Sequence, residues 1–118
     1  MAQEKNFENR LKKYLHESNC WYVKYWAGAA FTRSGIPDLL VCSEGCFMGI
    51  EVKGEGGKPT LLQLYHLQAI RDSGGYGILL YPKDFEAFKK FNEKKSKSNM
   101  WYLQNIEEQE EWTMKLDE

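Results

Sequence analysis

Three stretches of the chain carry apolar residues at the three- and four-residue spacing of an amphipathic helix. They cover residues 3–18, 60–73 and 85–95. The positions expected to face a core are Phe7, Leu11, Tyr14, Leu15, Leu61, Leu64, Leu67, Ile70, Phe85, Phe88 and Phe91. Thr60 and Gln63 fit a capping box, in which each side chain bonds the backbone N–H of the other residue, so we expect the second helix to begin there.

Shorter apolar runs between these helices indicate β-strands, because they are rich in aromatic and β-branched residues. These runs cover residues 20–27, 37–43, 46–53 and 76–81. The turn signal Glu44-Gly45 separates the second run from the third and predicts an antiparallel hairpin. Residues 101–103 are expected to add an edge strand. The resulting order, α-β-β-β-α-β-α, predicts an α/β fold with a mixed central sheet flanked by helices.

Two carboxylates interrupt this apolar pattern. Asp38 lies in the run IPDLLV and Glu51 lies in MGIEVKG. An ionised carboxylate in such a strand costs free energy unless it is paired or bound to a cation, and two of them on adjacent strands would repel each other. A divalent cation between them removes this cost, and carboxylate and carbonyl oxygens suit Mg²⁺ or Mn²⁺. We therefore expect a cation site here, within reach of the Val52 carbonyl.

Lys53 follows Glu51 by two residues, so strand alternation puts both side chains on the same face. A carboxylate-bound metal beside an ammonium group is suited to phosphodiester hydrolysis: the metal lowers the pKa of a bound water, and the lysine can orient that water or stabilise charge on the phosphate. Glu-x-Lys on a strand is also a common solvated pair. Pro37-Asp38, across the predicted hairpin, favours the catalytic interpretation.

The 118 residues suffice for one small domain, and the net charge is −1. Residues 105–118 hold six of the 17 acidic residues and one lysine, so residues 1–104 carry 15 basic and 11 acidic residues. We therefore expect a domain over 1–104, with a basic surface that could bind DNA, and an acidic tail over 105–118. Lys24, Arg33 and Lys58 are candidate phosphate contacts or ordinary surface charges.

The cysteines and the N-terminus indicate the compartment. Cys20, Cys42 and Cys46 make an odd count without a secretory signal, which argues against a disulfide framework. The two histidines lack the spacing that a zinc site would need, so we expect the cysteines to be small buried residues beside the hairpin. No apolar run is long enough to span a membrane, and a cytoplasmic setting is expected.

The residues of the expected cation site also match a known family. Pro37-Asp38 followed by Glu51-Val52-Lys53 resembles the signature of the PD-(D/E)xK nuclease superfamily. The wider string SGIPDLLV…FMGIEVKG…PTLLQLYHLQAIRDSGGYGILLYP is similar to the VRR-NUC branch, the virus-type replication-repair nucleases, over roughly residues 4–82. The resemblance implies a restriction-endonuclease-like fold, organised as in Holliday junction resolvases.

The resemblance also implies roles for individual residues. It implies a metal site whose ligands are Asp38, Glu51, the Val52 carbonyl and Glu8. It makes Lys53 the catalytic lysine, puts Gln63 near the active site, and puts Ser34 where resolvase-like relatives carry a serine near the scissile phosphate. Each of three residues has another explanation. Glu8 could pair with Lys12 on the helix surface, Gln63 could serve only the helix cap, and Ser34 could be a turn residue.

The function that this resemblance implies is a Mg²⁺- or Mn²⁺-dependent endodeoxyribonuclease that acts on branched DNA such as Holliday junctions. The protein is expected to be a homodimer, because a two-fold symmetric protein suits paired incisions in a symmetric junction. The resemblance also implies that it acts in a bacterium or a phage-infected cell. The alternatives are a nicking or flap endonuclease in phage replication or repair, and a DNA-binding module that has lost catalysis.

Overall fold

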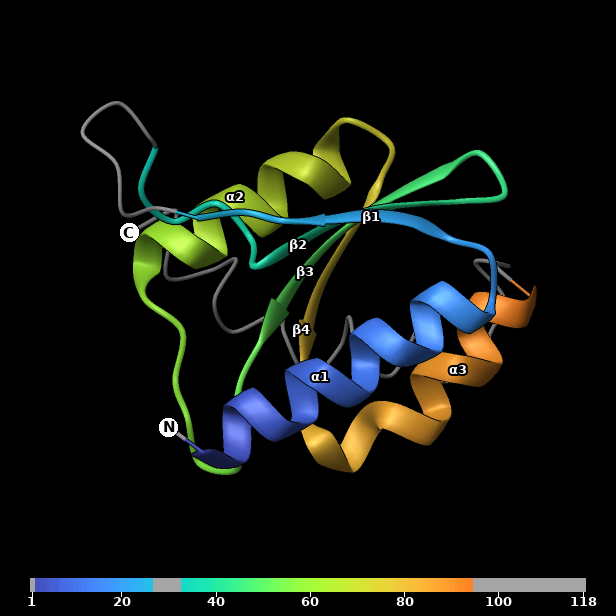
Figure 1. The fold of residues 1–118 in the computed structure, drawn as a ribbon. Helices are drawn as coiled ribbons and strands as arrows, with labels where there is room; N and C mark the ends of the chain where they lie inside the picture. The colour runs from blue at the N-terminus through green and yellow to red at the C-terminus, as the bar shows by residue number, and fades with distance from the viewer. Residues whose placement is uncertain (1, 27–32, 95–118) are drawn as a thin grey trace.

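The computed structural model describes residues 2–26 and 33–94, which form an α/β fold. This part of the chain contains a four-stranded sheet, three α-helices and one 3-10 turn (Figure 1). In chain order the elements are α1 (Ala2–Glu17), β1 (Trp21–Lys24), β2 (Leu39–Ser43), β3 (Cys46–Val52), α2 (Leu61–Asp72), β4 (Tyr76–Leu80), η1 (Pro82–Asp84) and α3 (Phe85–Lys94). The predicted order of helices and strands is confirmed for these residues.

The sheet is mixed, with its strands in the order β1-β2-β3-β4. β1 pairs with β2 and β2 with β3 in antiparallel fashion, so the predicted hairpin is confirmed. β3 pairs with β4 in parallel, and α2 makes the crossover between them. Leu39 lies opposite Ile50 at the start of β2, which puts that end of β2 beside the last residues of β3.

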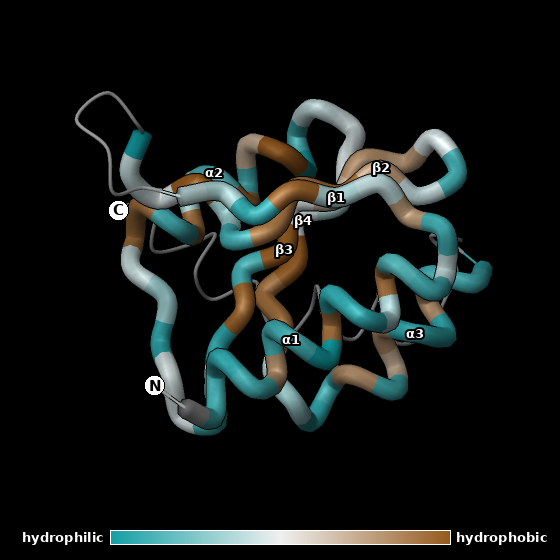
Figure 2. The backbone as a smooth tube through the Cα atoms, in the orientation of Figure 1, coloured by the Kyte–Doolittle hydropathy of each residue, from teal (hydrophilic) through white to brown (hydrophobic). Residues whose placement is uncertain are grey.

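The sheet is the middle of three layers, with α1 and α3 on one face and α2 on the other (Figure 1). Side chains along β3 point alternately to the two faces of the sheet. Met48, Ile50 and Val52 therefore share one face and belong to the core cluster formed with α1 and α3. That cluster includes edge-to-face ring pairs such as Phe7–Phe85, whose centroids are 5.4 Å apart. Hydrophobic residues concentrate along β4, between the helices (Figure 2). Glu51, at an intervening position, faces the α2 layer.

Two features fix α2 on the sheet. Its N-terminus has the predicted capping box between Thr60 and Gln63, and after its last residue, Asp72, the chain turns at Gly74, whose φ of +96° favours glycine. At Gly77 in β4, a Cβ would collide with the backbone carbonyl of Leu67, so only glycine allows this close approach. Leu64 and Leu67 are buried as predicted, but Leu61 is 61% exposed. The prediction for Leu61 is wrong because the buried face of α2 follows Leu64 and Leu67, away from the first turn.

Some boundaries differ from the sequence-based ones. β2 begins at Leu39, so Asp38 lies immediately before the strand and not within it. The expected edge strand at 101–103, the domain boundary at 104 and the acidic tail at 105–118 lie outside the described residues. None of the helices in the described ranges is both long and apolar enough to cross a membrane.

A buried polar network joins α1 and α3 to the hairpin of β2 and β3. Ser43 donates a hydrogen bond to Asn92 Oδ1 at 2.8 Å and accepts one from Cys20 Sγ at 3.2 Å. Asn92 Nδ2 donates to the Tyr14 hydroxyl at 3.1 Å. Cys20 is buried as predicted, but Cys42 is exposed because it occupies an outward position in β2. The network therefore satisfies the polar groups that α1, β2 and α3 bury together.

Asn92→Ala should lower the free energy of unfolding by about 2–3 kcal/mol, because it removes the acceptor of the buried Ser43 hydroxyl and the donor to the partly buried Tyr14 hydroxyl. Chemical denaturation followed by circular dichroism measures this loss. Glu93→Ala, at the next and exposed position of α3, is the control and should change stability by less than about 0.5 kcal/mol. Equal losses in the two variants would contradict a role for the network.

Candidate metal and catalytic centre

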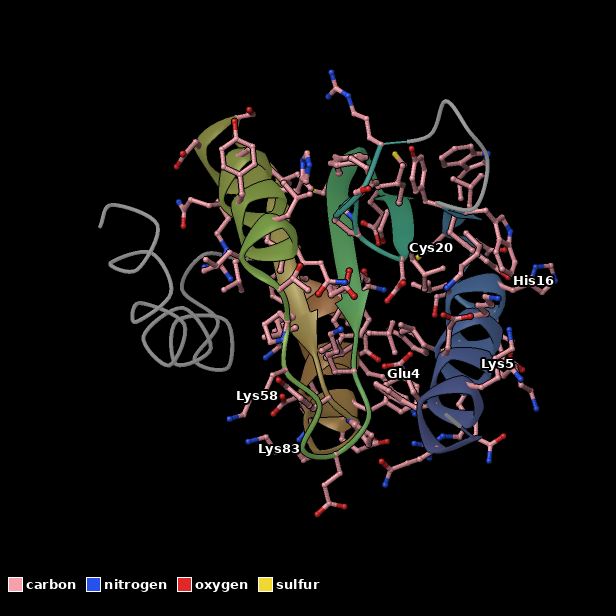
Figure 3. All side chains as sticks on the ribbon, turned by 90° about the vertical axis from the view of Figure 1, so that its left-hand side faces the viewer. Glu4, Lys5, His16, Cys20, Lys58 and Lys83 are labelled. Atoms are coloured by element: carbon pink, nitrogen blue, oxygen red, sulfur yellow. The ribbon has the colours of Figure 1, made fainter. Side chains whose placement is uncertain are left out.

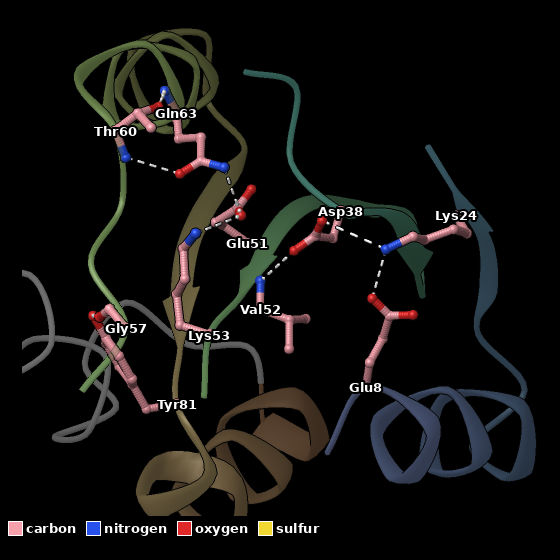
Figure 4. Close-up of polar contacts among 10 residues, drawn as sticks. All are labelled: Glu8, Lys24, Asp38, Glu51, Val52, Lys53, Gly57, Thr60, Gln63 and Tyr81. Carbon is pink, nitrogen blue, oxygen red and sulfur yellow. Dashed lines mark hydrogen bonds and ion pairs between the residues drawn. The ribbon is translucent and has the colours of Figure 1, made fainter. Parts of the chain in front are cut away.

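Asp38 and Glu51 meet at the edge where β2 begins and β3 ends. Continuing the register one step from Leu39–Ile50 puts Asp38 opposite Glu51. The Val52 amide donates a hydrogen bond to Asp38 Oδ2 at 2.9 Å (Figure 4). Val52 is the last residue of β3, and its N–H is satisfied by the Asp38 side chain in place of a backbone carbonyl. The same hydrogen bond fixes the Asp38 carboxylate beside Glu51.

Glu51 is almost fully buried, with 2% of its surface exposed. Its Oε2 accepts a hydrogen bond from Gln63 Nε2 at 3.0 Å and lies 3.5 Å from Lys53 Nζ (Figure 4). Its Oε1 is also buried and has no hydrogen-bond partner among the described residues. The predicted same-face placement of Glu51 and Lys53 is confirmed, but one carboxylate oxygen is left uncompensated.

The pKa of Glu51 reflects this shortage of partners. The pKa of Glu51 is raised from 4.5 to about 8: burial contributes most, the charge of Asp38 adds to the rise, and Lys53 opposes it only in part. At neutral pH the metal-free site therefore holds a proton where a cation could sit. A positive charge beside both carboxylates would remove the cost of ionising Glu51.

Gln63 serves both the helix cap and the site. Its side-chain oxygen accepts from the Thr60 amide at 2.9 Å, while its Nε2 donates to Glu51. The Thr60 hydroxyl accepts from the Gln63 amide at 3.1 Å and completes the capping box. One end of the Gln63 amide thus completes the cap and the other end contacts Glu51, while a role for Gln63 in an active site stays a prediction.

Glu8 lies in α1, where it is buried and bound by lysines. Lys24 Nζ is 2.6 Å from Glu8 Oε1, and Lys12 Nζ is 3.1 Å from Glu8 Oε2. Burial alone would raise the pKa of Glu8, but the ammonium groups of Lys24 and Lys12 outweigh it and hold that pKa below its ordinary value. Glu8 does form the i,i+4 pair with Lys12 that its spacing allows, and it is also part of a larger cluster.

Lys24 links Glu8 to the pair of carboxylates formed by Asp38 and Glu51. Its Nζ lies 3.5 Å from Asp38 Oδ1, so the ammonium group bridges Glu8 and Asp38 (Figure 4). Burial works against the charge of Lys24, but Glu8 and Asp38 outweigh that effect and raise its pKa. The sequence allows Lys24 to be a phosphate contact or an ordinary surface charge; only 19% of its side chain is exposed, so it is not an ordinary surface charge, and its role as a phosphate contact stays a prediction. Its place depends on a contact with α1 that strand periodicity does not encode.

The other predicted DNA contacts lie on the surface. Arg33 and Ser34 are exposed, and the Arg33 amide donates to the Tyr25 hydroxyl at 2.8 Å. Lys58 is exposed beside Lys83, where both line a hollow next to the loop that follows Lys53 (Figure 3). None of Arg33, Ser34 and Lys58 belongs to the carboxylate and lysine cluster described above. Their role as DNA contacts stays a prediction.

Tyr81 contributes to the site through this loop, and the sequence patterns did not single it out. Its hydroxyl donates to the Gly57 carbonyl at 2.7 Å, which ties the loop after Lys53 to the end of β4 (Figure 4). A tyrosine at the end of an apolar strand run is too common to signal such a contact. This hydrogen bond fixes the middle of the loop that separates Lys53 from α2.

The donor set fits one hard divalent cation with few protein ligands. Within residues 2–26 and 33–94, no three Asp, Glu, His or Cys side chains come close enough to form a metal site by themselves. Asp38 and Glu51 are the two carboxylates that lie together, and Lys24 separates them from Glu8. Mg²⁺ commonly uses one or two carboxylates and keeps several waters. The unpartnered oxygen of Glu51 fits such an ion.

No protein-family model, curated protein or solved structure matches this chain.

The stability of the metal-free protein should depend on pH through Glu51. Its folded-state pKa lies above the unfolded value, so the folded protein keeps a proton that the unfolded chain has lost. This contribution is complete at low pH and is lost as pH rises through about 8. The free energy of unfolding should therefore fall by a few kcal/mol between about pH 5 and 8.5, since a tenfold change in protonation is worth about 1.4 kcal/mol.

Urea titrations at several pH values, with chelator present, measure this dependence. Glu51→Gln should flatten it, whereas Glu55→Gln, which alters an exposed carboxylate nearby, should leave it unchanged. The assignment is wrong if Glu51→Gln keeps the full dependence on pH.

Proposed function

We propose that this protein is a metal-dependent nuclease that hydrolyses phosphodiester bonds in DNA, of the VRR-NUC type within the PD-(D/E)xK superfamily, with the restriction-endonuclease-like fold that this implies. One observation carries the proposal: the Glu51 carboxylate is buried beside Asp38 with one oxygen unpartnered, and Lys53 lies next to it. Buried ionisable groups without full compensation cost stability and are typical of sites with a chemical task.

The residues divide the chemistry between them. Asp38 and Glu51, with the neighbouring Val52 carbonyl, would hold Mg²⁺ or Mn²⁺. When bound, such an ion polarises the phosphate and lowers the pKa of a coordinated water. Lys53 can orient the attacking water or stabilise the charge that develops on the phosphate. Gln63 keeps the Glu51 carboxylate in one orientation through its amide hydrogen bond.

The proposed substrate is branched DNA, such as a Holliday junction, cut by a homodimer. This choice follows from the resemblance of residues around Pro37-Asp38 and Glu51-Val52-Lys53 to VRR-NUC nucleases. The exposed Lys58 and Lys83 beside the site provide positive charge where a DNA backbone would approach. Nicking or flap cleavage would use the same centre on a different DNA shape.

Purified protein should cut labelled branched DNA when Mg²⁺ or Mn²⁺ is added and should stop when a chelator is present. Asp38→Asn and Lys53→Met should each lower the cleavage rate at least about 100-fold, because they remove a metal ligand and the ammonium beside it. Asp72→Asn, which alters an exposed carboxylate in α2, is the matched control. Parallel assays on flaps, nicked duplex and linear duplex identify the preferred DNA shape.

Two results would overturn this assignment. Cleavage that survives in Asp38→Asn would show a contaminating nuclease. Metal-dependent DNA binding without cleavage of any substrate would favour the DNA-binding module that has lost catalysis.

The two roles of Gln63 can be separated. Thr60→Ala removes the hydroxyl of the capping box and should cost about 1 kcal/mol of stability while leaving the cleavage rate within about threefold. Gln63→Leu removes the hydrogen bond to Glu51 as well and should lower the cleavage rate about tenfold. Rates measured well below each variant's unfolding temperature make this comparison. Equal cleavage by Gln63→Leu and Thr60→Ala would restrict Gln63 to the cap.

A further inference from the structure

Glu8 is surrounded by more positive charge than it can neutralise. Lys24 and Lys12 approach its two oxygens at 2.6 and 3.1 Å, and Lys5 Nζ lies 3.7 Å from Oε2. The side chains of Glu8 and Lys24 are only 6% and 19% exposed, so solvent screens this pair weakly, whereas Lys5 is 57% exposed and more strongly screened. A divalent cation that approached Glu8 would meet three ammonium groups and one carboxylate. Glu8 Oε2 and Glu51 Oε1 are both buried without a hydrogen-bond partner among the described residues, but Glu8 Oε2 has ion pairs with Lys12 and Lys5, whereas the ion pair of Glu51 with Lys53 is made by its other oxygen.

Lys24 also occupies the space through which Glu8 could reach the other carboxylates. It bridges Glu8 Oε1 and Asp38 Oδ1, and Glu8 holds the shorter contact (Figure 4). Its side chain leaves β1 toward α1, on the same face as the partly buried Tyr22. The Lys24 ammonium is therefore held by Glu8 of α1 and lies against Asp38, next to the start of β2.

We propose that Glu8 is the anchor of Lys24 and not a metal ligand, and that Lys24 supplies a fixed positive charge beside Asp38, where a second cation would otherwise bind. The inference rests on the proposed nuclease function and specifies how its site is charged. One divalent cation then binds between Asp38 and Glu51. Lys24 and Lys53 flank that pair with two fixed charges, on the sides toward α1 and α2 respectively, and both can face a bound phosphate.

Calorimetric titration of the full chain with MnCl₂, without DNA, tests the inference independently of activity. Wild type should bind one ion, and Glu8→Gln should keep its affinity within about fivefold, because the variant loses an anchor and no ligand. Lys24→Met should bind Mn²⁺ at least about tenfold more tightly, because it removes a positive charge close to the ion. Lys24→Arg keeps the charge and should retain the wild-type affinity.

The same variants have opposite expected effects on cleavage. At saturating Mn²⁺, Lys24→Met should cut branched DNA at least about tenfold more slowly than wild type although it binds the metal better. Lys24→Arg should recover most of that rate. Lys12 and Lys5 still pair with Glu8 in Lys24→Met, so the variant is expected to fold, and circular dichroism with thermal unfolding verifies this.

Each contrary result has a distinct meaning. Loss of Mn²⁺ affinity by tenfold or more in Glu8→Gln would make Glu8 a ligand and overturn the inference alone. Unchanged or weaker affinity in Lys24→Met would likewise overturn it alone. Absence of Mn²⁺ binding in wild type would overturn the proposed metal site, and the inference with it. Glu8→Gln and Lys24→Arg conserve size or charge, so they decide the question even if Lys24→Met does not fold.

Discussion

The burial of one carboxylate beside another is the constraint on which the rest of this site depends. Glu51 lies in the central strand region with almost no exposed surface, and Asp38 is fixed next to it by the Val52 amide. Neighbouring side chains offset part of the free-energy cost of burying the Glu51 carboxylate. Gln63 donates one hydrogen bond, and Lys53 lies close enough to attract the charge. The remaining deficit, one buried oxygen without a partner, is the place where a divalent cation would contribute most.

The fold holds these groups in place by close packing of α2 on the sheet. Gly77 lets the backbone of α2 approach β4 more closely than any side chain would permit. The capping box then begins the helix at the point where Gln63 can reach Glu51. On the opposite face, α1 brings a carboxylate, Glu8, that is compensated by lysines alone. The two faces of the sheet thus hold a buried carboxylate in two ways: lysines contact both oxygens of Glu8, whereas Glu51 Oε1 has neither a hydrogen bond nor an ion pair among the described residues.

Local periodicity explains which features the sequence could predict. The strand alternation that puts Glu51 and Lys53 on one face and the spacing of the Gln63 capping box are both properties of a few consecutive residues, and both are confirmed. The position of Lys24 was not predictable, because it depends on the contact between β1 and α1. The exposure of Leu61 was missed for a similar reason, since hydrophobic spacing alone does not say where the sheet ends beneath a helix. The start of β2 at Leu39 was missed as well, because the apolar run IPDLLV does not show that the Asp38 side chain accepts the Val52 N–H.

Whether a cation binds between Asp38 and Glu51 can be seen in a crystal of the protein soaked in Mn²⁺, because anomalous scattering locates the ion without any assumption about activity. We expect one anomalous peak for each chain, between the carboxylates of Asp38 and Glu51, with Lys24 still bound to Glu8. A peak coordinated by Glu8, or no peak beside Glu51 at saturating Mn²⁺, would contradict it.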